Sequence, residues 1–292
     1  MNPKGSVEGR ILIISLVVLF SAAIAALILP ATAAAARDQA GPGLDSLLER
    51  AAKYCDKLSR SVLDFACRER IEEWFHPEAQ RFATGRFPVK RIIYVGRREK
   101  HAYLYDFQLI RDRAGSIRES RTLLKEDKQT VRVADAPLKT RLFWHAYVVM
   151  GPLGLLSRER QADHDYRIIG EEKVGKERAV IIEAVPKPGV RSEHLVGKIW
   201  LGSGDAGVLK IEWDPSSIAN YAGVEEAAKR FQMDPRIVMT SEYAFEKNGI
   251  RFPSRYTVQE IYASGRRRFQ RSQTDVFYDE YKFFTVETEV IY

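Results

Sequence analysis

The stretch WLGSGDAGVL, residues 200–209, contains a literal G-x-G-x-x-G motif directly after an apolar run. Such a motif could hold a dinucleotide only where the third glycine opens a helix, because the pyrophosphate binds to the free N–H groups at the helix N-terminus. Gly207 is instead followed by VLKIEW, which alternates as a strand does, and Asp214-Pro215 ends the segment. We therefore predict a β-hairpin between GKIWL and VLKIEW, with Gly204 and Gly207 supplying positive φ at the turn.

The histidines and carboxylates form no pattern typical of a metal centre or a catalytic site. The five histidines lie far apart, and none belongs to an H-x-x-x-H or similar ligand pair. Asp163-His164-Asp165 could bind a metal or relay a proton, but three polar residues leading into a strand are more typical of a solvated turn. No nucleophile elbow, Walker loop or H-E-x-x-H occurs. We predict no catalytic residue, no metal, no cofactor and no enzymatic activity, although a site assembled from distant strands would leave no trace in one sequence.

Cys55 and Cys67 are the two cysteines of the chain. Apolar residues recur at helical spacing from Leu44 to Ser59, which predicts an amphipathic helix with Cys55 on its apolar face. Cys67 lies in a segment of period two, on the same side as Phe65. Both thiols are therefore expected to point inward. In an oxidising compartment such a pair is most simply a structural disulfide, worth about 2 to 3 kcal/mol, and we predict that Cys55 and Cys67 are bridged.

The first 36 residues predict export. Lys4 and Arg10 precede an uncharged run from Ile11 to Leu29, and a tract of small residues follows at positions 31–36. This order is typical of a signal peptide with an A-x-A-type cleavage site. The apolar run is longer than the usual ~7 to 15 residues and approaches the ~20 that span a bilayer, so an uncleaved inner-membrane anchor over residues 11–29 is the alternative. We expect a periplasmic or otherwise exported protein with a single domain over residues 37–292.

Alternating apolar and polar residues dominate the chain past residue 60. Segments with this pattern are separated by turn signals such as Asn248-Gly249, which predicts an antiparallel meander of roughly nine to eleven strands. Two segments interrupt it. Residues 142–150 predict a short apolar helix, continued by an apolar loop through residue 156, and residues 216–231 predict a second helix. The net charge of +7 would, in an exported protein, favour anionic lipid head groups or acidic polymers over nucleic acid.

The block DYRIIGEEKVGKERAVIIEAVPKPGVRSEHLVGKIWLGSGDAGVLKIEW, residues 165–213, resembles the bacterial lipoprotein-carrier superfamily of LolA/LolB-like proteins. The shared pattern is a strand, a short Gly turn, a strand ending in a Pro-containing loop, and then paired G-K-I-W-L and V-L-K-I-E strands. Residues 240–262 resemble the hairpin that follows. The chain departs from the family in its greater length, in the insertion at residues 216–231 and in its two cysteines. The resemblance implies a mainly β (α+β) fold, a curled antiparallel sheet or incomplete β-barrel with an N-terminal helix and helical segments covering its open side.

In that superfamily the covered side of the sheet encloses a hydrophobic cavity for acyl chains. Carried onto this chain, the resemblance makes the segment at 142–156 a lid and places two tryptophans on the curled sheet. The ligand-cavity and lid candidates that it implies are Trp144, Tyr147, Met150, Leu153, Leu155, Trp200 and Trp213. For each of them ordinary core packing is the alternative, because an apolar segment between strands fits a core helix equally well.

Together these features favour a non-catalytic periplasmic binding or carrier protein for lipid or lipoprotein acyl chains, with contact to a membrane surface. The alternative is an envelope interaction or sensing module of the same fold, which contacts another protein and transports no ligand. A membrane-spanning barrel, suggested by the terminal VETEVIY, is disfavoured because residues 117–124 carry charges on both faces of a strand. We expect no nucleic-acid partner.

Overall fold

The computed structural model describes residues 43–61, 64–77, 80–84, 90–94, 96–111, 117–140, 148–190, 196–215 and 222–284. Residues 42–292 form one compact unit. The described elements, in chain order, are α1 (Leu44–Ser61), β1 (Asp64–Phe75), β2 (Gln80–Thr84), β3 (Lys90–Tyr94), β4 (Glu99–Arg111), β5 (Ile117–Glu126), β6 (Gln129–Val133), η1 (Val148–Met150), α2 (Gly151–Leu156), α3 (Arg158–Asp163), β7 (His164–Val174), β8 (Glu177–Pro186), β9 (Gly197–Gly202), β10 (Val208–Trp213), α4 (Ala222–Phe231), β11 (Asp234–Glu242), β12 (Phe245–Lys247), β13 (Ile250–Phe252), β14 (Arg255–Ser264) and β15 (Arg267–Phe283).

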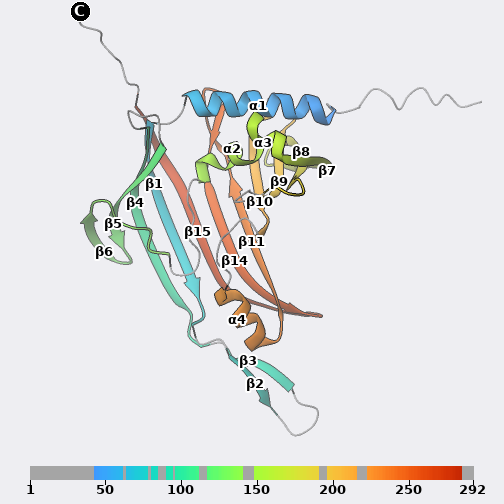
Figure 1. Cartoon of the computed structure of the whole chain (residues 1–292). Helices are drawn as coiled ribbons and strands as arrows, with labels where there is room; N and C mark the ends of the chain where they lie inside the picture. The colour runs from blue at the N-terminus through green and yellow to red at the C-terminus, as the bar shows by residue number, and fades with distance from the viewer. Residues whose placement is uncertain are drawn as a thin grey trace, which may run out of the picture. The chain divides into compact units, whose positions relative to one another are not determined.

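One antiparallel sheet of eleven strands carries the fold (Figure 1). Its strand order is β6-β5-β4-β1-β15-β14-β11-β10-β9-β8-β7, and β12–β13 and β2–β3 form two small hairpins outside it. β1 lies between β4 and β15, so the first and last of the described strands pair with each other. Because β6 and β7 end the order and do not pair with each other, the sheet formed by the described strands is open. The predicted curled antiparallel sheet, mainly β with few helices, is confirmed.

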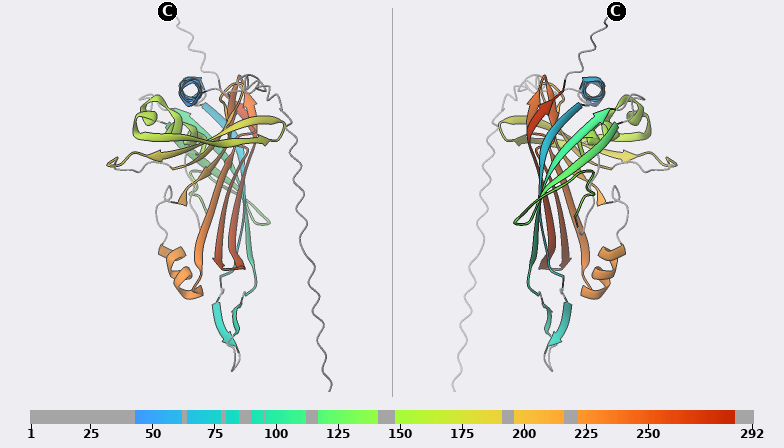
Figure 2. Two further views of the ribbon diagram at one scale, coloured as in Figure 1. Left: turned by 90° about the vertical axis from the view of Figure 1, so that its right-hand side faces the viewer. Right: turned by 90° about the vertical axis from the view of Figure 1, so that its left-hand side faces the viewer.

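The N-terminal helix α1 crosses one end of the sheet, with α2 and α3 beside it (Figures 1 and 2). Its apolar stripe, which includes Leu47, Ala51, Cys55 and Leu58, is at most 1% exposed. These positions are spaced by three or four residues, so they share the side of the helix that packs on the sheet. The predicted helix over residues 44–59 is confirmed and continues to Ser61.

Alternation along the strands divides the side chains between two faces of the sheet. On β4, Tyr103, Tyr105, Phe107 and Leu109 belong to the main core, in one cluster with side chains of α1 and α2. We call this side the inner face. Leu104 and its neighbours of even number on β4 point to the opposite side, which we call the outer face.

The inner face also buries an ion pair. Glu69 on β1 is fully buried and accepts hydrogen bonds from Arg121 Nε and Nη2 on β5, at 2.6 and 3.0 Å. The guanidinium group of Arg121 lies 4.6 Å from the ring centroid of Phe107 and also pairs with Glu119. Burial alone would lower the pKa of Arg121, but the hydrogen bonds and charge of Glu69 outweigh it and raise that pKa. This pair ties β5 to β1 across the intervening β4.

The glycine-rich stretch is the turn of a hairpin, as predicted. β9 and β10 pair antiparallel, and Gly202 N donates to Gly207 O at 2.9 Å. The predicted positive φ at Gly204 and Gly207 is wrong, because the left-handed residue is Ala206, with a φ of 57°. Asp205 Oδ1 accepts a hydrogen bond from Gly207 N at 2.9 Å, and a Cβ at Gly202 would lie 2.6 Å from that oxygen. A side chain at position 202 would therefore require the Asp205 carboxylate to move.

The helical interruptions differ in detail from the prediction. Residues 151–156, expected as an apolar loop, form the helix α2, which Pro152 can enter because its missing N–H lies in the first turn. Residues 141–147 lie outside the described part of the chain. α4 confirms the second predicted helix over residues 222–231, and positions 216–221 are not described. The predicted leader at residues 1–36 and the anchor alternative also lie outside the described residues, and no described helix is long and apolar enough to span a membrane.

Candidate functional site

Residues 148–156, which comprise η1 and α2, form a segment over the inner face that we call the apolar cover. Its sequence VVMGPLGLL contains no polar side chain. Val149, Leu155 and Leu156 are at most 2% exposed, whereas Met150 and Leu153 are half-buried and pack at the edge of the main core. Burying each large apolar side chain contributes about 1.5 to 3 kcal/mol. Apolar burial is therefore the main force that holds the cover down.

The cover rests on two aromatic side chains, Trp213 at the end of β10 and Tyr243 just after β11. A Cβ at Gly151 would lie 2.8 Å from Trp213 Cζ2 and 2.9 Å from Tyr243 Oη. Trp213 Nε1 donates to Ser241 Oγ at 2.7 Å, which satisfies the buried indole N–H. Glycine at 151 is what allows the backbone of the cover to lie directly on the aromatic floor.

Neighbouring side chains fasten the cover by its backbone carbonyl groups. Tyr243 O–H donates to Val148 O at 2.9 Å, and Cys55 Sγ lies 3.5 Å from Pro152 O. Tyr166 O–H donates to Leu155 O, and Gln161 Nε2 donates to Leu156 O at 2.8 Å. Each such bond stabilises by about 0.5 to 1.5 kcal/mol, because an open cover would exchange it for water. The fastening is therefore distributed over α1, α3, β7 and the segment after β11.

Among the described residues, no titratable group around the cover has the lowered pKa that activates a nucleophile. Burial raises the pKa of the Cys55 thiol from 9.0 to about 12, and the charge of Asp56 adds to the shift. Burial likewise raises the pKa of Tyr166 and of Tyr243 above the ordinary range of tyrosine. At neutral pH these groups are protonated, so the thiol is not the thiolate that attacks substrates or binds metals.

The sequence-predicted residues are only partly brought together. Leu155 and Trp213 meet at the cover, with Met150 and Leu153 at its rim, whereas Trp144 and Tyr147 lie outside the described residues. Trp200 belongs to a separate cluster on the outer face, because Ile199 and Leu201 on either side of it point inward. Trp200 Nε1 donates to Glu172 at 2.7 Å, and Lys210 Nζ lies 4.2 Å from the ring centroid.

Tyr243 and Gly151 were not among the predicted site residues. The only signal for Gly151 is its position before Pro152, inside an apolar run, and Tyr243 resembles any other strand aromatic. Side chains fill the space between the cover and the sheet, with Tyr243 fully buried and Trp213 9% exposed. Among the described residues, this part of the inner face is therefore closed to solvent beneath the cover.

Cys55 and Cys67 are free and buried thiols in the structure. The predicted disulfide is therefore not formed here, and the pairing stays a prediction. Burial raises the pKa of Cys67 as well, and the nearby charge of Glu69 adds to this shift. Two free thiols with raised pKa values are inert at neutral pH, so in this state both act as small core residues.

Asp163-His164-Asp165 is not the solvated turn expected from the sequence. His164 is 2% exposed, and its Nδ1 lies 2.8 Å from Arg160 O at the end of α3. The short helix α3 folds back over the ring, which a local pattern does not reveal. Within the described ranges no group of three or more His, Cys, Asp or Glu side chains could hold a metal ion.

Comparisons with known proteins find similarity in fold only. No protein-family profile and no curated protein matches the chain. A DUF1329 family protein from Desulfovibrio piger is 13% identical, with a TM-score of 0.36, over 84% of this chain and 94% of that one. A LolA superfamily protein from Nitrosomonas europaea is 13% identical, with a TM-score of 0.33, over 82% and 94%. An outer membrane lipoprotein-sorting protein domain from Vibrio parahaemolyticus is 11% identical, with a TM-score of 0.35, over 83% and 94%.

The second of these structures carries the name of the superfamily that the sequence resembles. With identities of at most 13% and TM-scores of at most 0.36, these likenesses extend to no ligand, residue role or activity.

Proposed function

We propose that this protein is a non-catalytic binding or carrier protein for lipid or lipoprotein acyl chains, acting in the periplasm after export. The apolar cover is the observation that carries the proposal. It lays a segment without polar side chains over Trp213 and Tyr243, and its neighbours hold it through backbone carbonyl groups. Lifting the cover would expose its own leucines and the aromatic floor together, which gives an acyl chain apolar surface on both sides.

The free-energy cost of opening the cover is small enough for a bound acyl chain to offset it. Opening exposes Leu155 and Leu156, at about 1.5 to 3 kcal/mol each, and exchanges a few hydrogen bonds for water. An acyl chain in the gap restores the apolar burial, since the hydrophobic effect is not directional. A ligand can shift this equilibrium only by its stronger binding to the open state. Long acyl chains, which bury many methylene groups, meet that condition best.

Co-purification tests the proposal directly. The protein, made in a bacterial periplasm and purified in native form, is extracted with organic solvent, and the extract is analysed by mass spectrometry. A fluorescent fatty acid is then titrated into delipidated protein. We expect bound phospholipid or acylated material in the first experiment and saturable binding in the second. Empty, folded protein that also ignores the fluorescent fatty acid would refute the carrier function.

One observation favours the second candidate, an envelope interaction module. β7 is an edge strand of the main sheet, and Ile168 and Ile169 on it are each 40% exposed, with Val185 on β8 at 44%. An edge strand with exposed apolar side chains can be extended by a strand from another protein. In-cell cross-linking of this protein to an envelope protein tests the module. A cross-linked product that is lost in Ile169→Lys but kept in the cover variant Gly151→Ala would support it.

A further inference from the structure

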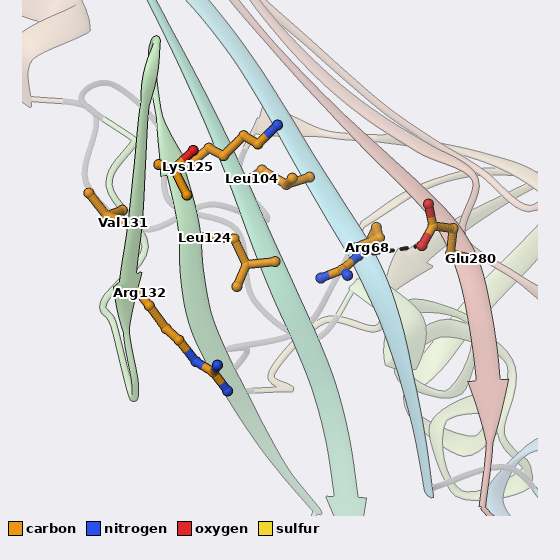
Figure 3. Close-up of a pocket in the computed structure, with 8 residues that line it drawn as sticks. Arg68, Leu104, Leu124, Lys125, Val131, Arg132 and Glu280 are labelled. Carbon is orange, nitrogen blue, oxygen red and sulfur yellow. Dashed lines mark hydrogen bonds and ion pairs between the residues drawn. The ribbon is translucent and has the colours of Figure 1, made fainter.

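The outer face carries a pocket of about 500 Å³ that the proposed function does not use (Figure 3). It lies over β1, β4, β5 and β6, on the side of the sheet opposite the apolar cover, and Glu280 on β15 reaches its edge. Its volume is within the range of roughly 300 to 1,000 Å³ that small-molecule sites have.

A β-bulge builds the apolar part of this pocket. Lys125 pairs with Leu104 and Leu123 pairs with Tyr105, so Leu124 is an extra residue in the ladder between β4 and β5. The ladder between β5 and β6 shifts at the same point, where Leu124 faces the two residues Val131 and Arg132. Bulges bend a strand and redirect its side chains. As a result Leu104 and Leu124, both half-buried, line the pocket from two strands, whereas the neighbouring Val131 on β6 packs against the main core of the inner face.

Cations surround this apolar lining. Arg68, Lys125 and Arg132 line the pocket, against the single carboxylate of Glu280. Arg68 Nε lies 3.4 Å from Glu280 Oε2, while its buried Nη1, 3.6 Å from Asp106 Oδ2, makes no hydrogen bond. Neither Lys125 nor Arg132 has an ion-pair partner in the part of the chain that the structure describes. An excess of unpaired positive charge beside an apolar wall attracts a molecule that is both anionic and apolar.

We propose that this pocket binds a free single-chain anionic amphiphile, a molecule with a carboxylate head and an alkyl tail. The tail would lie on Leu104 and Leu124. The head would accept hydrogen bonds from the exposed cationic side chains of Lys125 and Arg132, because ammonium and guanidinium groups form charge-assisted hydrogen bonds with a carboxylate. The pocket has room for one chain and not for the two chains of a phospholipid. The site is independent of the apolar cover, since it lies on the other face of the sheet.

Isothermal titration of delipidated protein with decanoate, below its micellar concentration, tests this site. The double variant K125Q/R132Q removes two unpaired, exposed charges of the pocket. The control Lys128→Gln removes one positive charge from the turn of the same hairpin, outside the pocket. We expect the double variant to weaken decanoate binding by about tenfold, since two charge-assisted contacts are lost, and Lys128→Gln to leave it within about twofold.

Further arms separate this site from its alternatives. Decanol, which has the tail without the charge, should bind more weakly than decanoate and show no difference between wild type and K125Q/R132Q. Unchanged decanoate binding in K125Q/R132Q, or an equal loss in Lys128→Gln, would overturn the proposal. It would also be overturned by full competition from inorganic phosphate, which would indicate a simple anion site, or by binding only to anionic vesicles. A cover variant such as Gly151→Ala should change the affinity for the long fluorescent fatty acid and leave the affinity for decanoate unchanged. This result would show that the two ligands bind at separate sites.

Discussion

Substituting Gly151 by alanine is the sharpest test of the apolar cover. In a helix, alanine is favoured over glycine by about 0.8 to 1 kcal/mol, so propensity alone predicts a stabilised protein. The new Cβ would, however, lie 2.8 and 2.9 Å from two ring carbons of Trp213 and 2.9 Å from Tyr243 Oη. Extra carbon in a packed site typically costs about 1 to 3 kcal/mol. We therefore expect Gly151→Ala to be neutral or to lower the free energy of unfolding by up to about 2 kcal/mol.

Gly223→Ala is the matched control, because Gly223 also lies in the first turn of a helix and a Cβ there would meet no atom within 4 Å. This variant should show the gain from helix propensity alone. Urea unfolding gives both free energies, and their difference, about 1 to 3 kcal/mol, measures the contact between the cover and the floor.

The same pair of variants tests function. If the cover is a lid, Gly151→Ala weakens its closed state, so the fluorescent fatty acid should bind more tightly to this variant than to wild type. Gly223→Ala should bind the fatty acid with the same affinity as wild type. Two results would refute the reasoning. Equal stabilisation by both substitutions would mean that the cover does not rest on Trp213, and destabilisation without a gain in binding would mean that it is ordinary core.

Three further predictions concern the buried polar groups. Arg121→Leu leaves Glu69 buried without its main partner and should lower the free energy of unfolding in urea at pH 7 by about 3 to 5 kcal/mol. In this variant the folded-state pKa of Glu69 would rise above its unfolded value, so the loss of stability should shrink as the pH falls. A loss that does not depend on pH would contradict this. If Cys55 and Cys67 are bridged, denatured and unreduced periplasmic protein reacts with no thiol reagent, whereas two reactive thiols rule the disulfide out. If the thiols are free, stability should instead fall as the pH rises from 9 towards 12. The reason is that the Cys55 thiol has a pKa of about 12 in the folded protein, whereas in the unfolded chain it ionises near pH 9. Tyr243→Phe removes the hydrogen bond to Val148 O and should lower the free energy of unfolding in urea by about 1 to 3 kcal/mol. The fluorescent fatty acid should also bind more tightly to this variant. Unchanged stability would show that this hydrogen bond does not hold the cover in place.

Local periodicity determined the elements of this protein. Apolar residues at a spacing of three or four predicted α1 and placed Cys55 on its buried side, and period-two alternation predicted the antiparallel sheet. The glycine-rich stretch could be assigned to a hairpin because VLKIEW alternates and ends at Asp214-Pro215. Such patterns are readable in the sequence because each one reflects a single element with one face on the core and one in solvent.

The site depended on contacts that join distant parts of the chain. Trp200 stands in an apolar run, so its sequence does not say which side it faces, and only pairing with β8 and β10 placed it outward. Gly151 meets Trp213 and Tyr243 because β10 and β11 bring these aromatics beneath the cover. The bulge at Leu124, which builds the outer pocket, changes a ladder register without changing the local pattern. The sequence by itself determined which segments are strands and helices, whereas the tertiary structure decided which side chains meet, because register and face are set by burial against residues far away in the chain.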